Sequence, residues 1–288
     1  MTSSSAQLRR LGAELRRLRE LTGRTQGDLG AVLGRTHASL VNWERGKTKI
    51  SKSDLAYLLA ELRAPAEVRR GLEELRVAAN QGRSPWATYD LPEWMRPLVS
   101  FEEDAVRVET FEPVLVPGLL QTEEYARALH EAGHHKVAPE FVDKWVAARM
   151  KRQERLTGKR PLKLHAVIPE AVLRLAVGGP DVLRQQLARL HEASTARNIT
   201  IQVLAADRSG YGGAASNFLV LNFADPGLDP PLACFDGPLG GYMISDEGDV
   251  ATFASMFKDL SRMALSAKDS TELLAKALAE QRGKGSTP

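Results

Sequence analysis

The chain has 288 residues, a net charge of +3, and 43% hydrophobic and 26% charged residues; this composition is typical of globular proteins and excludes a disordered or fibrous chain. No apolar run reaches the roughly 18 residues that a transmembrane helix needs, and the first residues lack the apolar stretch of a signal peptide. The single cysteine, Cys234, excludes an internal disulfide, so we expect a cytoplasmic protein, and the length suggests two domains.

The positive charge lies in the first part of the chain. Residues 1–80 carry 15 Lys and Arg against 9 Asp and Glu, whereas residues 81–288 carry 24 against 27. A basic domain that precedes a mildly acidic one is typical of a nucleic-acid-binding protein with a sensor or partner module. A chance separation of charge would give the same balance, so the assignment depends on the motifs.

About five helices are predicted within a first domain of residues 1–79. The first helix carries leucines at helical spacing and ends near Gly23. The next three begin after residues whose side chains can cap a helix N-terminus, which are Thr25, Thr36 and Ser51. The fifth is expected over residues 65–79.

A short turn at Gly34-Arg35 separates the second helix from the third, because glycine readily takes the left-handed conformation that ends a helix. Two short capped helices joined in this way define a helix-turn-helix, so the first domain is predicted to be an all-α helix-turn-helix bundle. Residues 80–92 contain two prolines and no periodicity, which predicts a linker or a strap.

Caps, turn glycine and a Glu-Arg-Gly ending occur together in the run from Thr25 to Lys47. This run resembles the XRE family of phage-repressor-like helix-turn-helix proteins, and the resemblance covers about residues 8–62. In that family the third helix lies in the major groove of DNA. The resemblance also implies that Glu44, a poor neighbour for phosphate, turns inward and pairs with Arg19.

Side-chain chemistry suggests a role for each expected DNA contact. Asn42 can bond an adenine edge bidentately, whereas Ala38 can only touch a thymine methyl group. Leu40 and Trp43 share another face that can be buried. Cations around the third helix would bind phosphates, although each polar residue alone is also typical of a solvated surface. The resemblance implies that His37, Ala38 and Asn42 lie at base edges and that Gln26 lies near a phosphate or base. The predicted DNA-binding residues are Gln26, Arg35, Thr36, His37, Ala38, Ser39, Asn42, Arg45, Lys47 and Lys49.

Residues 93–288 are predicted to form an α+β domain with a small mixed sheet surrounded by helices. Strands are expected where short runs alternate or are rich in β-branched residues, at 162–168, 199–204, 218–223, 232–235 and 241–244. Helices are expected at 122–130, 138–156, 170–177, 181–194, 247–264 and 270–282.

The string Val116-Pro-Gly-Leu-Leu-Gln-Thr122, together with later motifs such as Asn198-Ile-Thr-Ile-Gln-Val203, resembles the C-terminal domain of WhiJ-like or Scr1-like, antitoxin-type regulators of actinomycetes. The resemblance spans about residues 94–282 and implies a regulator of development or secondary metabolism. Members are often encoded beside a small acidic protein. Arg149 and Arg152 could dock such a partner, but their basic run is more typical of a solvated face, and it could also contact the DNA-binding domain.

Residues 93–288 offer no combination of nucleophile, base and orienting group, so we expect no catalytic residue, no cofactor and no metal site. Glu170 is interpreted as a structural helix-start carboxylate, and the adjacent side chains of His134 and His135 diverge. A ligand of a small-molecule sensor would lie near Tyr211 and Asp236. Cys234, inside an apolar strand, is expected to be buried and unreactive.

The leading hypothesis is a homodimeric, sequence-specific transcriptional regulator that binds a palindromic operator in double-stranded DNA, with helix 36–45 in the major groove. One alternative is an antitoxin-like module that binds a small acidic protein. Another is a regulator that senses a small molecule in the α+β domain. An enzyme is the least favoured hypothesis.

Overall fold

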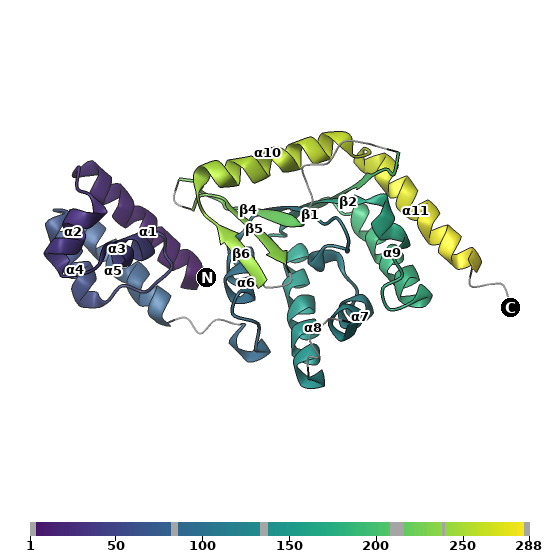
Figure 1. Ribbon diagram of the computed structural model, residues 1–288, viewed down its shortest axis with the longest axis horizontal. Coiled ribbons are helices and arrows are strands. Elements are labelled where there is room, and N and C mark those ends of the chain that lie inside the picture. The colour runs from purple at the N-terminus through teal and green to yellow at the C-terminus, as the bar shows by residue number, and fades with distance from the viewer. Residues whose placement is uncertain are drawn as a thin grey trace. The chain divides into compact units, whose positions relative to one another are not determined.

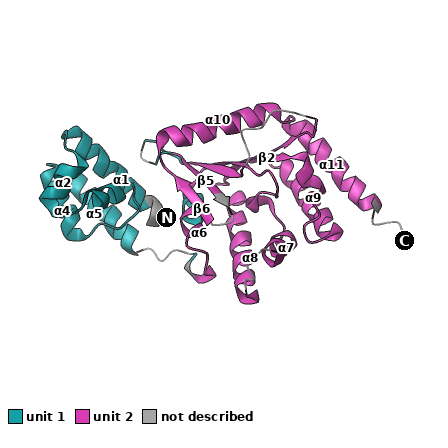
Figure 2. Ribbon diagram, viewed as in Figure 1, with its two compact units in different colours: residues 1–87, 99–104, 223–230 teal, residues 88–98, 105–222, 231–288 magenta. Residues whose placement is uncertain are grey.

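The structure is a computed structural model that describes residues 4–81, 86–132, 138–207, 216–227, 229–237 and 240–284 (Figure 1). The chain forms two compact units (Figure 2). The first unit comprises residues 1–87, 99–104 and 223–230, and the second comprises residues 88–98, 105–222 and 231–288. Two short segments that the sequence analysis placed in the second domain therefore cluster with the first unit.

The first unit contains the predicted helix-turn-helix bundle. Its helices are α1 (Ser4–Leu21), α2 (Gln26–Leu33), α3 (His37–Glu44), α4 (Lys52–Glu61) and α5 (Ala66–Gln81). The side chains of Thr25, Thr36 and Ser51 each accept a backbone N–H bond from the third residue of the helix that follows, as expected of N-caps. Gly34 ends α2 with a left-handed φ of 62°. The predicted helix starts are confirmed.

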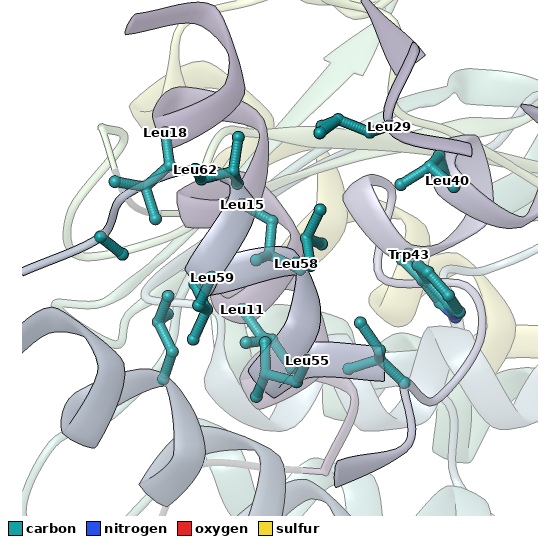
Figure 3. Packing of buried hydrophobic residues seen from close by; sticks show 13 residues of the cluster. Leu11, Leu15, Leu18, Leu29, Leu40, Trp43, Leu55, Leu58, Leu59 and Leu62 are labelled. Carbon is teal, nitrogen blue, oxygen red and sulfur yellow. The ribbon is translucent and has the colours of Figure 1, made fainter. Parts of the chain in front are cut away.

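A leucine-rich core joins these helices (Figure 3). Leu29 and Leu40 are fully buried, and Trp43 packs in the same cluster with 8% of its surface exposed. Burying one leucine side chain contributes about 1.5–3 kcal/mol to folding. Because Leu40 and Trp43 both point into this core, it fixes which face of α3 remains outside.

The second unit is built on a six-stranded mixed sheet in the order β3-β2-β1-β4-β5-β6. The pairs β1–β2 and β2–β3 are parallel, and the other three pairs are antiparallel. The strands are β1 (Arg107–Phe111), β2 (Lys163–Pro169), β3 (Ile199–Leu204), β4 (Phe218–Asn222), β5 (Leu232–Gly237) and β6 (Gly240–Ile244). The mixed sheet is confirmed, but the sequence analysis missed β1, a strand near its centre.

Helices surround this sheet as predicted. Figure 1 shows α10 lying along one face, where Phe257 and Leu260 pack against apolar strand residues. The helices are α6 (Met95–Asp104), α7 (Glu123–Ala132), α8 (Pro139–Gln153), α9 (Pro180–Ser194), α10 (Glu247–Met263) and α11 (Ala267–Lys284). Short 3-10 helices are η1 (Ala87–Tyr89), η2 (Gly118–Leu120), η3 (Glu154–Leu156) and η4 (Glu170–Arg174). The helix expected over 170–177 is thus a single 3-10 segment, and α6 was not predicted.

None of the helices in the described part of the chain combines the length and the hydrophobicity that crossing a membrane requires.

A close backbone contact between α1 and α3 gives a test of this fold. A Cβ atom on Gly12 would lie 2.5 Å from the carbonyl oxygens of Trp43 and Glu44, whereas a Cβ atom on Gly71 in α5 would meet nothing within 4 Å. Gly12→Ala should therefore lower the free energy of unfolding by about 1–3 kcal/mol, as overpacking does. Gly71→Ala should raise it by about 0.5–1 kcal/mol, because alanine is the better helix former. Denaturant unfolding of both variants measures the difference, and equal shifts would contradict this packing.

Candidate nucleic-acid interface

Hydrogen bonds fix both ends of α3. At its start, the Thr36 hydroxyl accepts the Ser39 backbone N–H, and the two side-chain hydroxyls lie 2.9 Å apart. At its end, the Lys47 backbone N–H donates to the Asn42 carbonyl at 2.8 Å, and Gly46 has a left-handed φ of 62°. These bonds use polar groups that a short helix would otherwise leave unpaired. The helix is therefore a defined element with one outer face.

The outer face of α3 carries most of the predicted base-reading residues. His37 and Ala38 are exposed, and Ser39 and Asn42 are half-buried. Residues 38, 42 and 45 are spaced so that they lie on one side of the helix. The predicted phosphate-binding cations Arg45, Lys47 and Lys49 are exposed at and beyond its C-terminal end. The predicted base-reading residues on α3 are thus at least partly accessible, and the predicted cations lie close to its end in the chain.

Arg35, a predicted phosphate contact, forms an ion pair with Asp54 of the same unit. Its Nε and Nη2 donate to the two carboxylate oxygens of Asp54, both at 3.1 Å. Asp54 follows the Ser51 cap and also accepts the Ser51 hydroxyl. The pair links the turn before α3 to the start of α4, so a phosphate at Arg35 would have to share its guanidinium with Asp54.

Glu44 is turned away from the outer face, as the resemblance implied. Its side chain is 4% exposed, and its two oxygens accept bonds from Arg19 Nε at 2.6 Å and Arg19 Nη2 at 3.0 Å. Hydrogen bonding to this carboxylate raises the pKa of Arg19. Gln26 Nε2 adds a third bond to Glu44 at 2.7 Å, which the sequence analysis missed. Gln26 is therefore held at the start of α2 by the end of α3.

The side chains of Arg149 and Arg152 in the second unit point inward, so they do not form the exposed surface that docking of a partner requires. Arg152 is 7% exposed, and Arg149 Nη1 donates to Gln121 Oε1 at 2.9 Å. A Cβ atom on Gly118 would lie 2.8 Å from Arg149 Nη1, so this glycine makes room for the guanidinium. A buried Arg152 cannot form part of an exposed basic face. Both arginines instead lie against the turn of residues 116–122.

Three glutamines to which the sequence analysis gave no role support this turn. Gln121 Nε2 donates to the Val116 carbonyl at 2.7 Å, and Gln153 Nε2 donates to the Gln121 carbonyl at 2.7 Å. Gln186, which is fully buried, donates to the Leu120 carbonyl and accepts the Thr122 N–H, each at 2.8 Å. The carbonyl groups of Val116, Leu120 and Gln121 and the N–H of Thr122 are thus bonded within the unit, which indicates a structural role for the turn.

Two further predictions for the second unit concern a ligand near Tyr211 and Asp236, and structural or buried positions for Glu170 and Cys234. Tyr211 lies outside the described residues, and Asp236 lies in β5 opposite Gly241, where its side chain is not described. Glu170 accepts bonds from Arg174 and from the Ala206 N–H, in agreement with a structural role. Cys234 is buried, as predicted. Among the residues that the structure describes, His, Cys, Asp and Glu side chains do not gather into a group that could hold a metal ion.

Comparison with known families gives two matches. The family described as a domain of unknown function (DUF5753) matches residues 95–276, well over half of the chain. The family described as a helix-turn-helix domain matches residues 10–72, the bundle whose outer face is given above. No curated protein and no solved structure matches the chain.

The buried Glu44 bonds predict a large difference between two ion pairs of the same unit. Glu44→Ala removes both hydrogen bonds between this carboxylate and the Arg19 guanidinium, which is only 13% exposed, and leaves Arg19 the longer contact of 3.5 Å with Glu20. It should lower the free energy of unfolding by about 3–5 kcal/mol. Glu14→Ala removes the partner of Arg17, whose side chain is 55% exposed, and should cost less than about 1 kcal/mol. Denaturant unfolding separates the two cases. A cost for Glu44→Ala no larger than for Glu14→Ala would show that Glu44 does not hold α3.

Proposed function

We propose that this chain, which belongs to the DUF5753 family and carries a helix-turn-helix domain in front of that domain, is a sequence-specific DNA-binding transcriptional regulator. The observation that supports the proposal most directly is α3. Its inner face is held by Leu40, Trp43 and Glu44, while its outer face presents His37, Ala38 and Asn42. A helix that is capped at both ends and supported on one side can enter a groove without rearrangement.

The geometry fits the major groove of B-DNA. An α-helix with its side chains is about 10–12 Å in diameter, which is close to the groove width of about 12 Å, so the eight-residue α3 can lie in the groove. The amide of Asn42 can donate to and accept from an adenine edge, and the methyl group of Ala38 can meet a thymine methyl. Lys47 and Lys49 would neutralise flanking phosphates and set the register without reading bases. Glu44, buried against Arg19, keeps its charge away from these phosphates.

We further propose that the regulator acts as a homodimer on a palindromic operator. One α3 reaches only a few base pairs, so two copies are needed to specify a longer site. The two recognition helices would enter the same side of the duplex about 34 Å apart, which sets the spacing of the half-sites. Each neutralised phosphate releases counterions, so affinity should fall steeply as salt is added.

For the second unit we propose regulation rather than catalysis. The narrower relationship to WhiJ-like and Scr1-like regulators is supported by the string in its 116–122 turn together with the later motifs such as residues 198–203. Because the side chains around this turn, Gln186 and Arg152 among them, are buried, the turn is better suited to hold the fold than to bind a partner. A small acidic protein would therefore dock at residues other than Arg152.

Base reading and phosphate binding are separable by mutation. Asn42→Ala should relax base preference at one operator position and weaken cognate binding by about 1–3 kcal/mol, because a bidentate base contact is lost. Lys47→Ala should weaken binding to all sequences alike and reduce the slope of log affinity against log salt by about 1. Selection of bound duplexes from a random pool, followed by titration at several salt concentrations, measures both effects.

A matched control is Lys258→Ala, which removes an exposed cation from α10 of the second unit. It should leave both the selected sequences and the affinity unchanged. If Asn42→Ala and the wild type select the same sequences with the same strength, α3 does not read bases through this residue.

A further inference from the structure

Two acidic segments complete the first unit. Residues 99–104, the second half of α6, and residues 223–230, which follow β4, cluster with the helix-turn-helix bundle. Every charged residue in these segments is acidic: Glu102, Glu103, Asp104, Asp225 and Asp229. Within the unit the segments meet Arg9 and Arg10 of α1. These contacts are separate from the outer face of α3.

Arg9 is enclosed by the two segments. It is 8% exposed, and its guanidinium carbon lies 4.9 Å from the ring centroid of Phe101 and 4.6 Å from that of Phe223. Its Nη2 also donates to the Pro230 carbonyl. Aromatic faces attract a desolvated cation more strongly than an exposed one. Burial lowers the pKa of Arg9 to about 10, so the side chain remains charged at neutral pH.

Arg10 adds an ion pair next to this enclosed cation. Its Nε donates to Asp229 Oδ2 at 2.5 Å, and Asp229 is 2% exposed. The other oxygen of Asp229 and Nη1 of Arg9 are buried without a hydrogen-bond partner among the described residues. Burying charges that are incompletely paired costs free energy, so such a group contributes little to stability. The presence of this group of Arg9, Arg10 and Asp229 is therefore better explained by the position in which it holds α1 than by a gain in stability.

The backbone of α1 at Arg9 touches the end of α3. A Cβ atom on Gly46, two residues beyond α3, would lie 2.7 Å from the backbone N and Cα of Arg9. One turn further along α1, Gly12 makes the same close approach to the last carbonyls of α3. Contacts between backbones are rigid, because no side chain can rotate to absorb a shift. The position of Arg9 therefore sets the position of the C-terminal end of α3.

We propose that Arg9, Arg10 and Asp229 are positioning residues for DNA recognition: the acidic segments hold the start of α1 through these side chains, and α1 holds the end of α3. The inference rests on the proposed DNA-binding function. It assigns a role in recognition to Asp229, which is 2% exposed and lies far outside the helix-turn-helix match in the sequence.

Charge and geometry predict opposite effects of one substitution. Asp229→Asn keeps the size of the side chain and removes one negative charge from the DNA-binding unit. Long-range electrostatics alone would then tighten binding to every duplex. Loss of positioning instead weakens binding to the selected operator, because base contacts depend on the placement of α3, while phosphate binding to unrelated DNA tolerates a shift.

The experiment compares full-length variants on the selected operator and on an unrelated duplex of equal length, at one salt concentration. For Asp229→Asn the ratio of the two affinities should fall about tenfold, which corresponds to ~1.4 kcal/mol. The control is Asp259→Asn, which removes the same charge from an exposed pair with Arg262 on α10 and should leave the ratio unchanged. An equal ratio for Asp229→Asn, Asp259→Asn and the wild type would overturn the inference.

Phe223→Leu provides a second variant that changes no charge. It removes one of the two rings around Arg9 and should lower the ratio in the same direction. Thermal unfolding shows whether each variant is folded at the temperature of the binding assay. If Asp229→Asn is unfolded there, the affinity ratio of Phe223→Leu tests the positioning role instead. A wild-type protein that prefers no duplex would refute the proposed function itself, whereas a selective wild type with unchanged variants would refute only the positioning role.

Discussion

The first unit depends on a carboxylate that is kept out of water. Glu44 ends α3 at the surface where DNA would approach, and its charge would repel phosphate there. Three bonds, two from Arg19 and one from Gln26, turn it inward and bind α3 to α1 and α2 at once. The same interaction that removes an unfavourable charge therefore also fixes the helix that presents Asn42. Loss of these bonds would affect orientation and electrostatics together.

The second unit uses buried polar groups in the same way. Gln121, Gln153 and Gln186 satisfy the backbone of the 116–122 turn, and Arg149 and Arg152 lie against it. The string that carries the family resemblance thus forms hydrogen bonds inside its own unit. The family match identifies the domain in this unit but assigns no activity to it. The described side chains around the turn form hydrogen bonds that hold the fold, and they do not form an exposed basic surface for a partner.

Local chemistry made much of this structure predictable. The helix starts at Thr25, Thr36 and Ser51 could be predicted because an N-cap depends only on residues next to it in the sequence. β1 was missed because its five residues, Arg107–Phe111, include two charged side chains and form a strand only between β2 and β4. α6 was missed because Pro97 interrupts its pattern, although proline is tolerated in a first turn. The Arg10–Asp229 pair joins residues 219 positions apart, which no local pattern can indicate.

The central claim is that the outer face of α3 and its flanking cations bind duplex DNA. Titration of the full-length wild-type protein into labelled duplexes of mixed sequence, first at low ionic strength and then with added salt, tests this claim most directly. The account predicts binding at low salt whose logarithmic affinity falls linearly with the logarithm of salt concentration, with a slope of several units from several neutralised phosphates. Absence of binding to every duplex at low ionic strength would contradict it.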